Sequence, residues 1–417
     1  MVVTQCVILV GGLGTRLGPL TATTPKPLLR VGSRVFLDYL VDEVARQGFD
    51  DVVCLAGYRA TEIQAWAERR ASGPRITVVA EPDPLGTAGA LTVARELLQE
   101  EFLMLNGDSL FDINLADFAA WQPDGPWQGI LALRSMKDAG RYGVVDFAGG
   151  AIKGFVERPA TEGSSGVINA GVYRLKREVV DRVASLPSSI ERDIFPQVAR
   201  QGLLRGRIYD SAFIDIGVPS SLQEAQSFLP SLAKRPALFL DRDGVLNRDV
   251  DYAFRPEQIE WFDGIFDVVK RANDEGCYVF VVTNQAGVAR GFYSEQDVVT
   301  LHAWMNRQFR ERGAYVDEFQ YCPHHPTAGI GAYRATCGCR KPAPGMITEI
   351  ARRWPVDLPR SLLVGDKESD LDAAKNAGVP SILYQGGSLS DVLNDWFIAN
   401  AGRRRNPAPD LSSVEVS

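Results

Sequence analysis

Carboxylates that directly follow apolar runs are the residues of this chain best placed to do chemistry. Asp241 and Asp243 stand two residues apart after the apolar run 237–240, and later apolar runs end at Thr283 and at Asp366. The carboxyl ends of parallel strands meet in one crevice of an α/β sheet. Carboxylate oxygens bind Mg²⁺, while a hydroxyl and a nearby lysine bind phosphate. The pattern therefore predicts a site for magnesium and a phosphate group.

A second group combines three of the six cysteines with two of the three histidines. Three thiolates and one imidazole suit a tetrahedral structural Zn²⁺ that leaves no open position for catalysis. His325 is the less suitable of the two imidazoles, and the alternative is a loop whose cysteines bind nothing. The expected zinc ligands are Cys322, His324, Cys337 and Cys339. Because Cys339 directly precedes Arg340 and Lys341, zinc would also hold these two basic residues in place.

A glycine-rich loop follows the first apolar run of the chain. In Gly11-Gly12-Leu13-Gly14-Thr15-Arg16-Leu17, the glycines let backbone N–H groups approach phosphate oxygens closely. Arg16, and Lys26 within a Pro-Lys-Pro element, add positive charge for a triphosphate. The spacing is neither that of the P-loop nor that of the dinucleotide fingerprint. For the glycines alone, a tight turn without a ligand is the alternative.

Short apolar runs alternate with amphipathic stretches along the chain, which predicts βαβ units and mostly parallel sheets. Expected strands include residues 7–10, 52–56, 76–79, 102–105, 237–240, 279–283 and 361–365, and expected helices include 36–47 and 88–99. A segment with two prolines near residue 230 separates two such series. The expected organisation is a domain at 1–228, a linker at 229–236, a domain at 237–390, and an extension at 391–417 whose end is disordered.

Composition and charge exclude several functions. The chain has 417 residues and a net charge of −7, so a general nucleic-acid binder, which needs a basic face, is not expected. No stretch approaches the roughly 20 apolar residues of a membrane span. Residues 1–10 lack the basic start and the cleavage site of a signal peptide. We therefore predict a cytoplasmic protein with reduced thiols and no membrane partner.

The N-terminal motifs together resemble those of the sugar nucleotidyltransferases, over residues 3–228. After the glycine loop and Pro-Lys-Pro, the matching pieces are Pro-Leu-Gly-Thr-Ala-Gly (84–89), Asn-Gly-Asp (106–108), Tyr-Gly-Val-Val (142–145), Val-Glu-Arg-Pro (156–159), Ile-Asn-Ala-Gly (168–171) and Phe-Ile-Asp-Ile-Gly-Val-Pro (213–219). The resemblance implies a Rossmann-like domain in which a sugar 1-phosphate attacks the α-phosphorus of a nucleoside triphosphate. Catalysis of such a step is mainly positioning and charge neutralisation.

The same resemblance implies a role for each motif residue. Arg16 and Lys26 would be catalytic, and Asp108 and Asp215 would hold Mg²⁺. The nucleotide-binding residues would be Gly11, Gly12, Gly14, Thr15, Gly86 and Thr87. The sugar-binding residues would be Gly143, Glu157, Arg158 and Asn169, although many members have lysine in place of Arg158. Taken alone, Asp108 would be a turn residue and Asp215 a buried ion-pair partner.

The C-terminal motifs resemble those of the haloacid dehalogenase-type phosphatases, over residues 236–386. This implies a second doubly wound domain, in which Asp241 is the nucleophile and Asp243 the general acid and base. Mg²⁺ would be held by Asp241, Asp366 and the backbone carbonyl of Asp243, with Asp370 behind them. The phosphate-binding residues would be Thr283, Asn284, Arg340 and Lys341. The alternative is a regulatory domain that has lost catalysis.

The fine pattern of this half, with Asp-Arg-Asp-Gly, Asn-Gln-Ala-Gly-Val-Ala-Arg-Gly and Cys-Gly-Cys-Arg-Lys-Pro, resembles the heptose 1,7-bisphosphate phosphatases more than the histidinol-phosphate phosphatases. Their product, heptose 1-phosphate, is the substrate type of the heptose 1-phosphate guanylyltransferases, which the N-terminal motifs resemble. The fusion implies a bifunctional enzyme that uses GTP, heptose 1,7-bisphosphate and heptose 1-phosphate to make a sugar nucleotide for a cell-surface glycan. Two alternatives stay open: a mannose or glucose 1-phosphate nucleotidyltransferase fused to another sugar phosphatase, and a non-catalytic sugar-nucleotide-binding regulator. A homo-oligomer is also open.

Overall fold

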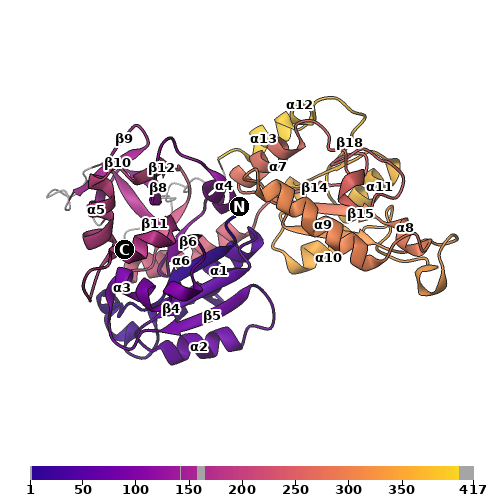
Figure 1. Cartoon of the computed structure of the whole chain (residues 1–417). Coiled ribbons are helices and arrows are strands. Elements are labelled where there is room, and N and C mark those ends of the chain that lie inside the picture. Colours follow the sequence, from indigo (N-terminus) through magenta and orange to yellow (C-terminus); the bar gives the residue numbers. More distant parts are fainter. Residues whose placement is uncertain (1, 141, 157–164, 403–417) are drawn as a thin grey trace, which may run out of the picture. The chain divides into compact units, whose positions relative to one another are not determined.

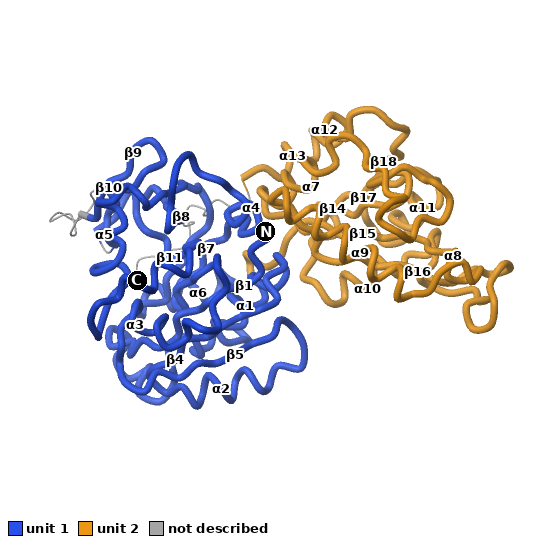
Figure 2. Tube along the Cα trace, viewed as in Figure 1, with its two compact units in different colours: residues 1–230, 404–417 blue, residues 231–403 orange. Residues whose placement is uncertain are grey.

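The computed structural model describes residues 2–140, 142–156 and 165–402. The chain divides into two compact units, one within residues 1–230 and one within residues 231–403 (Figures 1 and 2). Glu157 and Arg158, and the end of the C-terminal extension, lie outside the described residues. Among the described helices, none is both long enough and apolar enough to cross a membrane.

The first unit contains a nine-stranded sheet of order β5-β4-β1-β6-β11-β8-β12-β10-β9. Its parallel half consists of β5 (Arg75–Ala80), β4 (Asp51–Ala56), β1 (Gln5–Leu9) and β6 (Glu101–Asn106). The other half consists of β11 (Gly166–Lys176), β8 (Gly129–Met136), β12 (Leu204–Ile208), β10 (Ala151–Val156) and β9 (Val144–Ala148). A short antiparallel pair joins β7 (Ser109–Phe111) to β13 (Phe213–Asp215).

This second half of the sheet departs from the mostly parallel arrangement expected from the sequence. β11 runs antiparallel to both β6 and β8, and β10 runs antiparallel to both β12 and β9. A buried apolar run has the same composition in either direction, so the pattern of β11 could not show its orientation. The β11–β8 pairing shifts register between Asn169 and Tyr173, a bulge that contains Gly171 at φ 76°.

Helices surround the sheet of the first unit. They are α1 (Phe36–Arg46), α2 (Ala60–Glu68), α3 (Gly86–Val93), α4 (Leu115–Ala120), α5 (Phe195–Arg200) and α6 (Pro219–Ala233). The helix expected over 88–99 is shorter, because α3 ends at Val93 and a 3₁₀ turn follows at Arg95–Leu97. The Gln5 side chain donates to the Leu97 carbonyl and accepts from the Gln99 N–H, so these backbone groups are satisfied without further helix.

The second unit has a fully parallel five-stranded sheet, as the alternating pattern predicts. Its order is β16 (Glu318–Cys322), β15 (Tyr278–Asn284), β14 (Ala237–Leu240), β17 (Leu362–Gly365) and β18 (Ser381–Leu383). Leu238 and Leu240 face a core formed with α7 (Ile265–Asp274), α9 (Glu295–Arg310) and α13 (Asn394–Asn400). The alternate residues, Ala237 and Phe239, face α10 (Gly345–Arg353) and α11 (Glu368–Ala377). Both faces are therefore buried.

Two segments expected to lie outside the domains, the linker and the C-terminal extension, are partly helical. α6 continues to Ala233 through Pro230, so most of the expected linker 229–236 belongs to a helix, with Leu229 buried. The expected extension beyond residue 390 contains α13, in which Phe397 is fully buried under the Arg271 guanidinium at 4.3 Å. A buried aromatic ring within the core cluster makes α13 part of the second unit.

Truncating Phe397 tests whether α13 completes this core. Phe397→Ala should lower the free energy of unfolding of the second unit by about 3–5 kcal/mol, because it leaves a cavity in a closed core. Ile398→Ala, at a neighbouring side chain that is 63% exposed, should change it by less than about 0.5 kcal/mol. Urea unfolding followed by fluorescence measures both. Equal effects of the two substitutions would contradict the packing described here.

Candidate active sites

In the first unit, the carboxyl ends of β1 and β6 open into a cleft of about 350 Å³. The glycine loop follows β1, and Gly107 and Asp108 follow β6. Six residues selected from the sequence line this cleft: Gly11, Gly12, Lys26, Gly86, Thr87 and Asp108. The strand ends therefore bring together the glycine loop, the expected base-binding loop and one expected metal ligand.

Two of the glycines in this cleft are required by close backbone approach. A Cβ at Gly107 would lie 2.4 Å from the carbonyl oxygen of Leu9 on the neighbouring strand. Gly86 has φ 78°, and a Cβ there would lie 2.4 Å from the carbonyl oxygen of Ser188. Any side chain would push these segments apart, so glycine holds the cleft at its present width.

The charged groups of the first site converge on Lys26. Its buried ammonium lies 2.5 Å from the Asp108 carboxylate and 3.9 Å from that of Asp215. The Gly217 N–H donates to Asp215, and a Cβ at Gly217 would lie 3.1 Å from both the Lys26 Nζ and an Arg16 Nη2. Both expected metal ligands and both expected catalytic cations thus surround one point, although Arg16 and Asp215 are not in the cleft lining. The carboxylates suit a hard divalent cation.

Two glutamates in the cleft were not identified from the sequence. Glu81 accepts a hydrogen bond from the Leu85 N–H at 3.2 Å, and burial raises its pKa. Glu191 accepts from the Thr87 hydroxyl at 3.1 Å. Glu81 stands just before the Pro84–Gly89 motif, so its position relative to that loop was the available signal. Glu191 lies far along the chain, and only the fold brings it to Thr87.

The expected sugar-binding residues are placed less uniformly. Asn169 donates to the Tyr173 hydroxyl at 2.9 Å, and that hydroxyl contacts Glu191 at 3.4 Å, so Asn169 connects to the cleft through two side chains. Gly143 is exposed and does not line the described cleft.

Gly14 begins the 3₁₀ turn at Thr15–Thr21 with φ 63°, and Thr15 is exposed there. Gly14 and Thr15, two of the expected nucleotide-binding residues, therefore belong to the loop beside the cleft.

In the second unit, the carboxyl ends of β14, β15 and β17 open into a cavity of about 420 Å³. Residues selected from the sequence that line it are Asp241, Asp243, Thr283, Asn284, Arg340, Lys341 and Asp370. The cavity thus joins residues that are separated by up to about 130 positions in the chain.

Lys341 is the central charge of this cavity. Its ammonium lies 2.9 Å from Asp241, 2.7 Å from Asp370 and 2.8 Å from the Val282 carbonyl. Burial opposes the charged form, but the two carboxylates outweigh it and raise the pKa of Lys341. Burial also raises the pKa of Asp241 to about 6 despite the lysine. A further cation beside Asp241 would favour its ionised form.

Three carboxylates at this end of the sheet fit a divalent metal ion, although Asp366 is not in the cavity lining. One oxygen each of Asp241, Asp366 and Asp370 lies within 4.8 Å of the others. Oδ1 of Asp366 is buried and has no hydrogen-bond partner, and burial raises the pKa of Asp366. A Cβ at Gly244 would lie 2.3 Å from Asp366 Oδ2, so glycine lets this carboxylate approach the Asp241 loop. An unpaired carboxylate oxygen among three acids is the environment that Mg²⁺ relieves.

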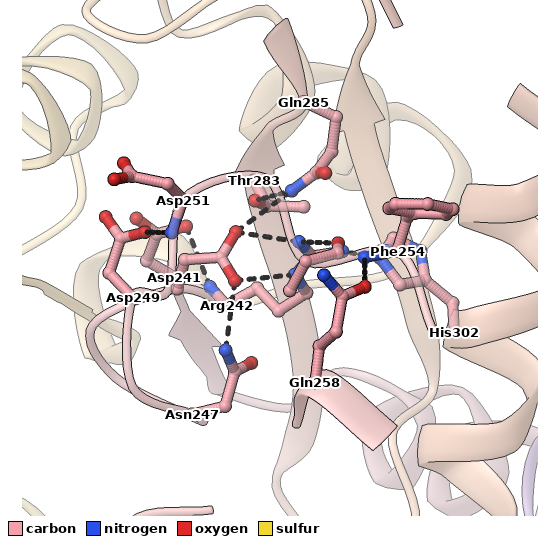
Figure 3. A network of polar contacts seen from close by, with 12 residues as sticks. Asp241, Arg242, Asn247, Asp249, Asp251, Phe254, Gln258, Thr283, Gln285 and His302 are labelled. Carbon is pink, nitrogen blue, oxygen red and sulfur yellow. Dashed lines mark hydrogen bonds and ion pairs between the residues drawn. The ribbon is translucent and has the colours of Figure 1, made fainter. Parts of the chain in front are cut away.

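Asp243 differs from Asp241 because four N–H groups donate to it. Arg242 donates from Nε at 3.1 Å and from Nη2 at 2.8 Å, Asn247 at 3.0 Å and Gln285 at 3.2 Å (Figure 3). Burial raises the pKa of Asp243, but the Arg242 charge and these donors outweigh burial and lower it overall. Arg242, Asn247 and Gln285 were not selected from the sequence, although Arg242 lies between the two aspartates.

Each expected phosphate-binding residue is held by a hydrogen bond, and two of them, Asn284 and Lys341, bond to each other. The Asn284 side chain donates to the Lys341 carbonyl and accepts from the Lys341 N–H, both at 3.1 Å. The Thr283 hydroxyl accepts from Gln285 at 2.9 Å. Arg340 donates to the His324 carbonyl at 3.1 Å, which connects the cavity to the cysteine loop.

The structure brings Cys322, His324, Cys337 and Cys339 together, with their ligand atoms all within 4.8 Å of one another. The three sulfur–sulfur distances are 3.2, 3.2 and 3.5 Å, and His324 Nδ1 lies 3.8 Å from Cys322 and 3.5 Å from Cys339. Zn–S bonds of about 2.3 Å in a tetrahedron give edges of about 3.8 Å, close to these values. His325 instead accepts from the Thr327 and Ala328 N–H groups.

Comparison with known proteins finds relatives of both units. The Nucleotidyl transferase family matches residues 5–231, and the HAD-hydrolase-like family matches residues 338–400. The D-glycero-beta-D-manno-heptose-1,7-bisphosphate 7-phosphatase of Rhodopseudomonas palustris is 47% identical over 168 residues, 40% of this chain and 93% of that protein. The D-glycero-alpha-D-manno-heptose-1,7-bisphosphate 7-phosphatase of Burkholderia mallei is 49% identical over 150 residues, 36% of this chain and 79% of that protein. Among solved structures, HddC from Yersinia pseudotuberculosis complexed with GMP-PN is 27% identical, with a TM-score of 0.49, covering 55% of this chain and 99% of that one.

The fold and the sites define a two-part enzyme, a nucleotidyltransferase followed by an HAD-type phosphatase. The chain belongs to the nucleotidyl transferase family through its first unit and to the heptose-1,7-bisphosphate 7-phosphatase family through its second.

Proposed function

We propose that the chain converts heptose 1,7-bisphosphate into a GDP-activated heptose in two successive reactions. The second unit would remove the 7-phosphate, and the first would then transfer GMP from GTP to the heptose 1-phosphate, releasing pyrophosphate. One observation carries this proposal: a nucleotidyltransferase is fused to a phosphatase whose relatives are named for heptose 1,7-bisphosphate. Removing the 7-phosphate leaves a sugar 1-phosphate, the type of nucleophile that the transferase reaction needs.

In the proposed phosphatase step, Asp243 first takes up a solvent proton, because its N–H partners keep it ionised in the free chain. Asp241 then attacks the phosphorus atom while the bond to the sugar oxygen breaks and Asp243 gives that oxygen the proton. Water then attacks the aspartyl phosphate and returns a proton to Asp243, which releases inorganic phosphate and restores Asp241. Lys341, 2.9 Å from Asp241, would neutralise the phosphoryl oxygens together with Thr283. Mg²⁺ held by Asp241 and Asp366 would supply additional positive charge when bound.

In the proposed transferase step, the chain positions two anions and neutralises them. Lys26 would contact phosphates of both reactants, since its ammonium lies at the edge of the cleft beside Asp108. Arg16 would neutralise the departing pyrophosphate. Asp108 and Asp215 would hold Mg²⁺, which supplies charge at the α-phosphate when bound.

Guanine recognition is assigned to Glu81. The edge of guanine presents an N1–H and a 2-amino group side by side, two donors that match the two oxygens of one carboxylate. Adenine presents an acceptor and a C–H at the same place, and uracil presents one donor between two carbonyl groups. Glu81 lines the cleft next to the base-binding loop and is half-buried, where an ionic hydrogen bond is stronger than in water. This chemistry favours GTP.

The cysteine cluster is proposed to hold one structural Zn²⁺. Four ligands close a tetrahedron, so the ion would take no part in catalysis. Its function would be to fix Arg340 and Lys341, which follow Cys339 directly and line the cavity. A reducing compartment such as the cytoplasm would keep the thiols available.

Zinc analysis of the purified protein tests this site. The chain should contain about one zinc ion, and Cys337→Ser should lose it together with most of the phosphatase activity, because a structural zinc contributes directly to local folding. His325→Gln is the matched control and should retain zinc. Wild-type protein without zinc, with all three thiols open to titration, would refute the assignment.

Substitution of Glu81 tests the base preference. Glu81→Gln keeps the size of the side chain but replaces one acceptor with a donor, so kcat/KM with GTP should fall by about tenfold or more. The values with UTP should fall far less, which lowers selectivity. Glu96→Gln, at an exposed side chain outside the cleft, is the control. A parallel loss with every triphosphate would contradict recognition of guanine by Glu81.

The order of the two reactions is tested with one variant in each unit. With heptose 1,7-bisphosphate, GTP and Mg²⁺, Asp241→Asn should make almost no sugar nucleotide, yet it should use heptose 1-phosphate normally. Asp108→Asn should release phosphate but form no sugar nucleotide, and mixing the two variants should restore the product. Mass spectrometry identifies each species. Formation of GDP-heptose 7-phosphate by Asp241→Asn at a good rate would reverse the proposed order.

A further inference from the structure

Arg242, which stands between the two aspartates of the phosphatase site, is completely enclosed. Its side chain is 0% exposed, and it is the largest fully buried side chain among the described residues. A buried cation is costly unless its charge and its N–H groups are matched by partners. The contacts of Arg242 therefore show which groups compensate its buried charge.

Two N–H groups of the Arg242 guanidinium bind the Asp243 carboxylate. Nε and Nη2 donate to the two oxygens of Asp243 at 3.1 and 2.8 Å, so the planes of the two groups are fixed relative to each other (Figure 3). On the other side of this carboxylate, Gln285 donates to Oδ2 and Asn247 to Oδ1. Gln285 and Asp243 line the cavity, whereas Arg242 does not.

The Arg242 guanidinium is also held by two groups outside the aspartate motif, the Ala253 carbonyl and His302. Nη2 donates to the Ala253 carbonyl at 2.9 Å, and Nη1 lies 3.3 Å from His302 Nε2 on α9. His302 is buried and stacks on Phe319 with 4.7 Å between ring centroids. Burial, and then the Arg242 charge, lower the pKa of His302 well below its usual value, so the neutral ring offers a lone pair to Nη1.

We propose that Arg242 is a positioning residue, which holds the Asp243 carboxylate so that its Gln285 side faces the reacting phosphate. In the substrate complex, Asp243 takes up a solvent proton on this side, in place of the Gln285 hydrogen bond. It then gives that proton to the leaving sugar oxygen as the phosphorus–oxygen bond to that oxygen breaks. His302 and the Ala253 carbonyl hold Arg242 in place, and Arg242 in turn holds the Asp243 carboxylate. The position of Asp243 therefore depends on α9, which carries His302. This inference rests on the proposed phosphatase function.

The leaving group of the substrate separates positioning from a purely structural role. Nitrophenolate leaves p-nitrophenyl phosphate without a proton, whereas the alkoxide of heptose 1,7-bisphosphate needs one. In the full chain, Arg242→Met should slow first-turnover release of the sugar by about 100-fold, the usual contribution of a general acid. Release of nitrophenol should slow by less than about fivefold, since it needs no acid. KM for the sugar should change by less than about threefold, because Arg242 does not line the cavity.

Two further variants keep the test decisive. Arg242→Lys keeps the charge without the two-pronged contact, and it should show the same dependence on the leaving group even if the methionine variant does not fold. Arg235→Met removes another buried guanidinium of this unit, which donates to the Gly276 carbonyl and does not line the cavity, and it should affect both substrates equally. Equal slowing of both substrates in the Arg242 variants would overturn the positioning role. Failure of the wild-type chain to hydrolyse either substrate would overturn the phosphatase function and this role with it.

Discussion

Each unit depends on one buried lysine that is held between two carboxylates from distant parts of the chain. Lys341 contacts Asp241 and Asp370, and Lys26 contacts Asp108 and lies near Asp215. For the fully buried Lys341 pairs, removing one partner costs about 3–5 kcal/mol, because the other charge stays uncompensated. The cost is smaller for Lys26–Asp108, since the Asp108 side chain is 37% exposed. The strand ends that carry the carboxylates are therefore held together by the same two lysines that would neutralise phosphate.

In the second unit, further hydrogen bonds connect Lys341 to the cysteine cluster. The Lys341 backbone is held by the Asn284 side chain, and Arg340 is held by the His324 carbonyl next to the cysteine cluster. A metal ion in that cluster would thus act on the cavity at a distance, by fixing the segment 339–341. Such a structural role would account for a Cys-His ligand set next to an active site.

The two aspartates of the phosphatase motif are separated by environment more than by sequence. Burial raises the pKa of Asp241, whereas Arg242, Asn247 and Gln285 lower that of Asp243 overall. These shifts are opposite to the order that an ionised nucleophile and a protonated general acid need, so a bound cation and substrate would have to reverse them. Asp241 needs a cation to favour its ionised form, while Asp243 is supported entirely by N–H groups of the protein.

The sequence alone determined the two α/β units, the strand ends that carry the acids, and the Cys-His set, because these depend on local patterns and spacing. The same information could not show the antiparallel pairings in the first sheet, since a buried strand has the same composition in either direction. Nor did it single out Glu81, Arg242 or His302, because what these side chains contact depends on burial and on partners from distant parts of the chain. Lone polar residues gain chemistry only when packing removes water and supplies partners, and the tertiary structure decides which residues meet.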